Sequence, residues 1–164
     1  MPAFTPPPPV AVQLLPAQGV GFDGSVLGQS LETWRAAQTQ SACAAPVGVV
    51  TTCTLPAVNL GDGNMARDLV FEFVDGRLAR IRFLTSIDAY QEVRALLDPR
   101  LGAPHTIQRN AIHLDESVDT AHLRDSWTLA GATVILNDPE RDGVSLSVTF
   151  ALDSLAGRLK PEPA

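Results

Sequence analysis

The stretch LVFEFVDGRLARIRF, residues 69–83, decides the fold of this chain. Large apolar side chains recur at every second position on both sides of Asp75-Gly76, and this period is typical of strands that bury one face. An Asp-Gly dipeptide between two alternating runs is a strong turn signal. We therefore predict an antiparallel β-hairpin over these residues.

The length of the hairpin loop decides which residues pair, because cross-strand partners must lie on the same face. A two-residue loop at Asp75-Gly76 would pair Phe71 with Arg80 and Leu69 with Arg82, and would bring charge onto the apolar face. We expect instead a three-residue loop over 74–76, with Gly76 in a bulge. This register gives three pairs: Phe71 with Ala79, Leu69 with Ile81, and Asp68 with Arg82.

Two helices and further strands surround this hairpin. One helix is expected after Ser30, a favourable N-cap, and another after residues 85–86, ending at Gly102. Strands are expected near residues 49–55, 105–110, 127–129, 133–136 and 144–150. The order of helix, strand and hairpin then occurs twice. We predict an α+β fold, an antiparallel sheet of about six to eight strands with two main helices on one face, arising from a probable tandem α-β repeat.

The large apolar side chains of these elements form the predicted core. Its members are Trp34, Leu69, Phe71, Phe73, Ile81, Phe83, Tyr90, Val93, Leu97, Trp127, Leu146, Val148 and Phe150.

The two ends differ in composition from the middle. Four consecutive prolines at residues 6–9 favour an extended polyproline II segment, which neither continues a helix nor donates to a sheet. We expect a flexible N-terminal segment over residues 1–20, a single α+β domain over 21–159, and a disordered tail over 160–164.

Charge and hydropathy exclude some classes of function. The formal net charge is -6 at pH 7, so there is no basic footprint for a nucleic acid backbone. No apolar run is long enough for a transmembrane segment. Met1 is not followed by the basic and apolar stretches of an export signal, and we expect that such a signal was removed from this chain.

The two cysteines, Cys43 and Cys53, enclose a short loop rich in Ala, Val and Thr. Their spacing matches neither a redox CxxC motif nor a zinc site. We expect a disulfide, which is typical of proteins outside the cytoplasm; the alternative is a pair of free, buried thiols in a cytosolic protein.

Two stretches resemble a loose group of small exported bacterial proteins. They are residues 27–30, leading into a helix with Trp34, and residues 73–78, followed by a helix that ends at residues 101–104. This layout is similar to the tandem helix-plus-strands fold of the β-lactamase inhibitory protein and of the small outer-membrane assembly lipoproteins. The resemblance implies protein binding across a sheet surface and supplies no binding residue.

A polar segment carries the residues most suited to metal binding, namely His113, Asp115, Glu116, Asp119 and His122. Their spacing fits no metalloprotease helix or calcium loop, so we expect a solvated acidic loop with no metal. The chain also has no Gly-rich phosphate turn and no nucleophile elbow, and we predict no cofactor and no enzymatic activity.

The predicted function is recognition of an unknown protein of the cell envelope, in the periplasm or otherwise outside the cytoplasm, through the solvent-facing side of the sheet. The expected binding residues are Glu72, Arg80, Arg82, Ser145, Ser147 and Thr149. The first alternative is a small-molecule or lipid carrier, with a cavity lined by Phe71, Phe83 and Trp127. The second is a metal-dependent enzyme, in which His113 or His122 meets a carboxylate in a cleft.

Overall fold

A computed structural model gives the arrangement of residues 12–15, 19–22, 24–61, 64–104, 106–115, 118–129, 131–138 and 144–159. The proline run at residues 6–9 and the tail at residues 160–164 lie outside these described ranges. None of the helices in the described ranges is long and apolar enough to cross a membrane.

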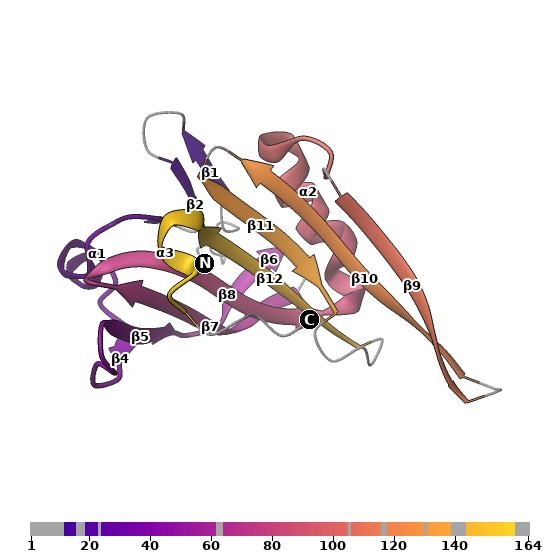
Figure 1. The fold of residues 1–164 in the computed structure, drawn as a ribbon, viewed down its shortest axis with the longest axis horizontal. Helices are drawn as coiled ribbons and strands as arrows, with labels where there is room; N and C mark the ends of the chain where they lie inside the picture. The colour runs from indigo at the N-terminus through magenta and orange to yellow at the C-terminus, as the bar shows by residue number, and fades with distance from the viewer. Residues whose placement is uncertain are drawn as a thin grey trace, which may run out of the picture.

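The main feature is a nine-stranded antiparallel sheet in the order β4-β5-β7-β8-β12-β11-β10-β9, with β6 paired to the first part of β7 (Figure 1). Its strands are β4 (Ala42–Cys43), β5 (Val50–Leu55), β6 (Val58–Gly61), β7 (Asn64–Val74), β8 (Arg77–Ser86), β9 (Thr106–Asp115), β10 (Val118–Leu129), β11 (Ala132–Asn137) and β12 (Ser145–Leu152). The predicted α+β class with an antiparallel sheet is confirmed, with more strands than expected. The tandem repeat and the placement of two helices on one face stay predictions.

A second, three-stranded sheet precedes the main one. Its strands are β1 (Val12–Leu15), β2 (Gly19–Phe22) and β3 (Ser25–Val26). Strands therefore begin inside the N-terminal segment that the sequence predicts to be flexible up to residue 20. Phe22 of this sheet stacks on Phe83 and Phe150, with ring centroids 4.8 and 5.7 Å apart, so the small sheet contributes to the core.

Few helices are present in the described chain: α1 (Leu31–Ala37), a 3-10 turn η1 (Ile87–Ala89), α2 (Tyr90–Leu101) and α3 (Asp153–Ala156). Ser30 caps α1 as expected, because its hydroxyl accepts a hydrogen bond from the Thr33 amide at 3.2 Å. Helix α2 ends at Gly102, whose φ of 78° is disfavoured for other residues.

The predicted core is correct for all members except Tyr90, which is half-buried and packs against the cluster. Trp34 of α1 contacts Phe71 and Phe73 of β7, at centroid distances of 4.9 and 5.2 Å. The buried Trp34 indole N–H donates to the Ser25 hydroxyl at 2.9 Å, so its polar atom is satisfied as well. These contacts fix α1 and the small sheet against β7.

The hairpin of β7 and β8 exists, but its predicted register is wrong. Asp75 and Gly76 form a two-residue turn in which both residues have positive φ, 50° and 76°. Ala79 is an extra residue in β8, because Glu72 pairs with Arg80 while Phe73 pairs with Leu78. Without the bulge, the tight turn would pair Phe71 with Arg80. The extra residue shifts the pairing by one position, so that Phe71 lies opposite Ile81. The observed pairs are Phe71 with Ile81, Glu72 with Arg80, and Val70 with Arg82.

The acidic segment near residue 115 is also different from the expectation. It is not a loop, because β9 and β10 form a long antiparallel hairpin through it, with His113 paired to Asp119 and His122 to Asn110. Figure 1 shows this hairpin extending beyond the rest of the sheet. The sequence of this segment shows no apolar alternation, so strands through it were not expected.

Candidate functional site

The predicted binding surface on the sheet is mostly buried. Glu72 and Arg80 face each other across β7 and β8 as a bidentate ion pair, with Arg80 Nε to Glu72 Oε1 at 2.7 Å and Nη2 to Oε2 at 2.9 Å. Ser147 and Thr149 expose only 2% and 1% of their surface, and Ser145 is buried too. Among the six residues, Arg82 alone is half-buried. The expectation that this face meets solvent is therefore wrong for the other five.

The segment after β12 returns to the sheet. Helix α3 packs against β12 and β8, and the Thr133 hydroxyl on β11 donates to the Asp153 carboxylate at 2.8 Å. Arg158, further along, pairs with Asp75 at the tip of the β7–β8 hairpin. Alternation in β12 correctly predicts which residues share a face, but it does not show whether that face is covered.

A different part of the surface is open, at the end of the sheet formed by β4 and β5. Cys43 and Cys53 are directly opposed on these strands and form the predicted disulfide, with an S–S distance of 2.01 Å. The chain between them turns at Gly48, where the amide of Val47 donates to the Val50 carbonyl at 2.9 Å and the reverse bond is 3.1 Å. The disulfide and these bonds together hold the hairpin in one conformation.

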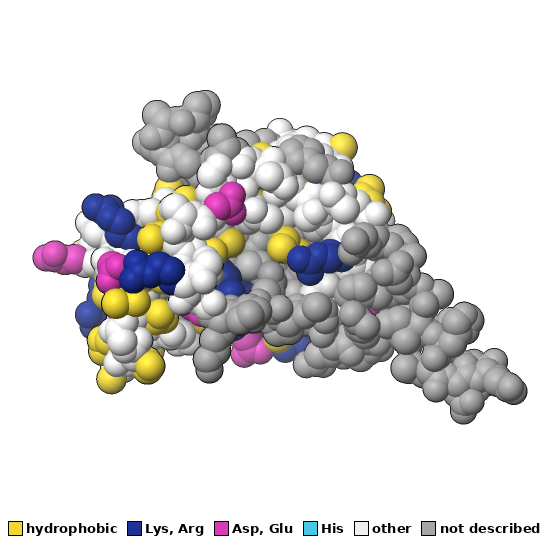
Figure 2. All heavy atoms as spheres, in the orientation of Figure 1, with side chains coloured by type: hydrophobic (Ala, Val, Ile, Leu, Met, Phe, Trp, Pro, Cys, Tyr) yellow, Lys and Arg dark blue, Asp and Glu magenta, His cyan; other side chains and the backbone are white. Residues whose placement is uncertain are grey.

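The tip of this hairpin, residues 44–49, is apolar and exposed, and we call it the apolar tip. Val47 is 80% exposed and Val49 45%, while Ala44, Ala45 and Pro46 are exposed as well. Figure 2 shows hydrophobic side chains gathered at the end of the molecule where Figure 1 places β4 and β5. Single exposed apolar residues are ordinary, but a contiguous set indicates an interaction site.

The same region carries no formal charge. The sequence contains no Asp, Glu, Lys or Arg between Arg35 and Asp62, although the chain as a whole has a net charge of -6. This range includes the apolar tip, β4, β5 and β6. Edge strands are protected from association by charged side chains, by proline or by being very short. β4 has no charged side chain, and its protection is limited to its length of two residues and to Pro46.

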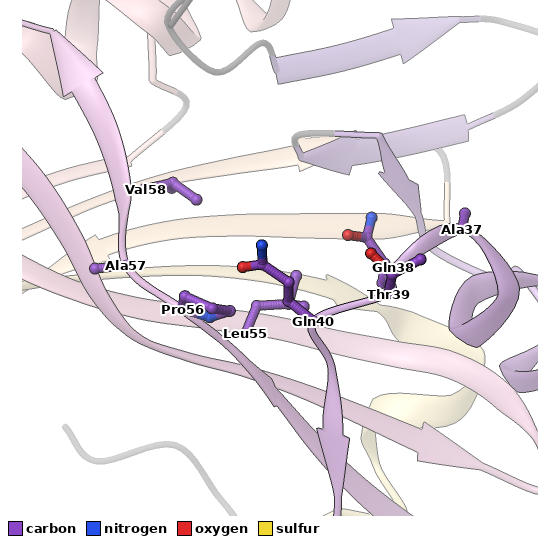
Figure 3. Close-up of a pocket in the computed structure, with 8 residues that line it drawn as sticks. All are labelled: Ala37, Gln38, Thr39, Gln40, Leu55, Pro56, Ala57 and Val58. Carbon is purple, nitrogen blue, oxygen red and sulfur yellow. The ribbon is translucent and has the colours of Figure 1, made fainter.

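A pocket of about 280 Å³ lies at the other end of β4 and β5 from the tip. It lies between the end of α1 and the connection between β5 and β6 (Figure 3). The side chains of Gln38 and Gln40 extend their amides into the opening, and Val58 lies across it. We call it the glutamine pocket; its lining is Ala37, Gln38, Thr39, Gln40, Leu55, Pro56, Ala57 and Val58, all uncharged.

The most connected cluster of charged groups in the described chain joins α2 to β10. Tyr90 donates its hydroxyl to the fully buried Asp125 at 2.5 Å, and Arg94 contacts both, as well as Asp98 at 2.9 Å. The hydrogen bond to Asp98 is the largest cause that raises the pKa of Arg94 above its ordinary value. Each group is engaged by another group of the chain, so the cluster fastens the helix to the sheet.

Other expected sites receive little support from the geometry. Phe71, Phe83 and Trp127 are buried, and the glutamine pocket is lined by other residues. The described side chains contain no group of three or more His, Cys, Asp or Glu suited to a metal ion. The backbone of His113, Asp115, Asp119 and His122 lies in β9 and β10, whereas Glu116 is outside the described residues.

The sequence analysis missed the apolar tip as a surface. A signal was present, because an uncharged run of small and β-branched residues between two cysteines is where a stapled, exposed loop is expected. No family model, no curated protein and no solved structure matches this chain.

Proposed function

We propose that this chain is a non-catalytic recognition domain that works outside the cytoplasm and binds protein through the apolar tip and the adjoining edge strand β4. The observation that carries this proposal is the exposed Val47 on a disulfide-stapled hairpin. A rigid loop loses little conformational entropy on binding, so its modest apolar area contributes more to affinity than that of a flexible loop would. The recognition surface thus differs from the sheet face that the sequence suggests.

A protein fits this surface better than a membrane does. Membrane-surface segments combine Lys and Arg with large aromatic side chains, and anionic lipids attract basic chains. The tip carries only Ala, Pro, Val and Gly, and the chain has a net charge of -6. Small groups without charge suit a shallow uncharged surface on another folded protein.

The location outside the cytoplasm rests on the disulfide. Bonds between cysteines persist in oxidising compartments and are rare in the cytosol. Cys43 and Cys53 are the only cysteines of the sequence and are bonded to each other, as in domains that depend on such a staple.

The test is capture of envelope proteins on the immobilised, oxidised chain and on two variants. Val47→Asp places a charge at the apolar tip, and Val144→Asp places the same charge at another exposed valine, 63% exposed. The proposal predicts that mass spectrometry finds one set of proteins on the original chain and on Val144→Asp, and loses it on Val47→Asp. Equal capture by all three chains would exclude the tip as the recognition surface.

A further inference from the structure

We infer that the protein recognised by this edge is a second copy of the same chain, paired antiparallel through β4. The inference rests on the recognition surface proposed above and names its partner. Three observations carry it: the direction of the free backbone groups of β4, the positions of the apolar tip and the glutamine pocket, and the absence of charge between them.

The backbone of Cys43 is turned toward the open edge of the sheet. Cys43 and Cys53 have Cα atoms 4.0 Å apart, the short spacing of an antiparallel pair that exchanges no hydrogen bonds. The Ala44 amide donates to the Thr52 carbonyl at 2.9 Å, which is the bond expected beside such a pair. The N–H and C=O of Cys43 therefore point away from β5, where β4 ends the described order of strands.

If a two-fold axis lies beside Cys43, the N–H and C=O of Cys43 form hydrogen bonds with the second copy. Cys43 of each copy then donates to and accepts from Cys43 of the other, the hydrogen-bonded pair of an antiparallel ladder. Pro46, which has no N–H, follows at a position that leaves these two bonds intact. The result is one continuous sheet across two copies, the known mode of strand addition at an exposed edge.

The same axis brings unlike surfaces together. The apolar tip follows β4 in the chain and the residues of the glutamine pocket precede it, so antiparallel pairing carries the tip of one copy toward the pocket end of the other. Thr39 lines the glutamine pocket with Gln38 and Gln40. Each copy thus presents a convex apolar end to the other's concave end, and the contact forms twice.

The distribution of charge favours pairing of two copies through β4 over pairing through the opposite edge of the sheet, β9. Two identical surfaces place like charges close together, and the range between Arg35 and Asp62 holds none. The other end of the sheet is β9, whose sequence contains Arg109 and Asp115. Asp75 lies beside the apolar tip, because its amide donates to the Val49 carbonyl at 2.9 Å, and its carboxylate is paired with Arg158. Self-association of a chain with net charge -6 is therefore less opposed by like charges at β4 than at β9.

The expected affinity is modest. An edge of two residues with one tip contact on each side belongs to the class of interfaces below about 1,200 Å², which are typical of weak complexes. We expect a dissociation constant on the order of 10–100 µM.

Sedimentation velocity of the oxidised chain, from about 1 µM to about 1 mM, tests the inference. The original chain and Val144→Asp should show the same monomer–dimer equilibrium. Val47→Asp should weaken it by about tenfold or more, because each copy then buries an unpaired carboxylate. Thr39→Lys, at an exposed position, should restore dimerisation when combined with Val47→Asp, since each new carboxylate then faces a new ammonium.

Circular dichroism and thiol titration confirm that each variant is folded and oxidised before it is compared. A chain that stays monomeric throughout, or a combined variant as weak as Val47→Asp alone, overturns the dimer. If Val47→Asp nevertheless fails to capture an envelope protein other than this chain, the proposed function stands without the dimer. If Val47→Asp changes neither measurement, both are wrong.

Discussion

Glu72 and Arg80 are direct neighbours on β7 and β8 and form a two-bond ion pair whose side chains are only 12% and 6% exposed. Charged groups on strands that alternate with apolar residues are expected to face solvent. Here each charge is buried and compensated by the other, which changes what mutation of the pair does. The Glu72–Arg80 ion pair is therefore part of the folded structure and not a binding site for a partner.

Removal of one member should strongly destabilise the chain. Arg80→Ala leaves the Glu72 carboxylate buried without this arginine, and we expect the free energy of unfolding to fall by about 3–5 kcal/mol. Arg82→Ala, at a half-buried position two residues away, should cost much less. Urea denaturation measures both, and equal losses would contradict the structural role of Arg80.

Replacement of both members should cost less than removal of one. Glu72→Leu combined with Arg80→Met removes both charges of the pair, and such exchanges are often neutral or stabilising. A double-mutant cycle is the measurement. Losses that simply add would mean that the two side chains do not depend on each other.

Tyr90→Phe tests the connection between α2 and β10. The substitution removes hydrogen bonds to Asp125 and Arg94 at 2.5 and 2.7 Å, and hydrogen bonds to charged groups contribute about 1.5–3 kcal/mol each. Asp98→Asn, at a side chain that is 40% exposed, should change stability by less than about 1 kcal/mol. A larger effect of Asp98→Asn in thermal unfolding would show that the helix is fastened differently.

The disulfide should stabilise the whole chain and the hairpin in particular. Cys43 and Cys53 are 10 residues apart, and closure of such a loop contributes about 2–3 kcal/mol in the loop-entropy estimate. Cys43→Ala with Cys53→Ala should lower the free energy of unfolding by this amount. Hydrogen exchange should show faster opening of β4 and β5 first. Unchanged exchange there would mean that backbone pairing alone holds the edge.

The sequence predicts the elements of this fold better than their arrangement. Alternation between residues 69 and 83 predicts the β7–β8 hairpin and its buried side chains, and Ser30 predicts the start of α1. The register failed because a bulge at Ala79 compensates for the tight turn; Asp75-Gly76 indicates the turn, but nothing in the sequence marks the bulge. Phe22 was missed because its partners Phe83 and Phe150 are distant in sequence.

The candidate site was predicted only in part, for the same reason. Residue spacing correctly indicates the Cys43–Cys53 bond, because it is local. Burial of Thr149 depends on what covers the sheet, and alternation reports only which residues share a face. Exposure of Val47 likewise depends on β4 being the last strand of the described order, which no local pattern reveals.

The most direct test of recognition through the apolar tip is photo-crosslinking in the cell envelope, with a benzophenone side chain at position 47 or at position 144. Both valines are exposed, at 80% and 63%, so both probes reach solvent. We predict discrete protein adducts from position 47 and none of the same mass from position 144, with an adduct of twice the chain mass if the partner is a second copy. No adduct from position 47, or the same adducts from both positions, would contradict the account.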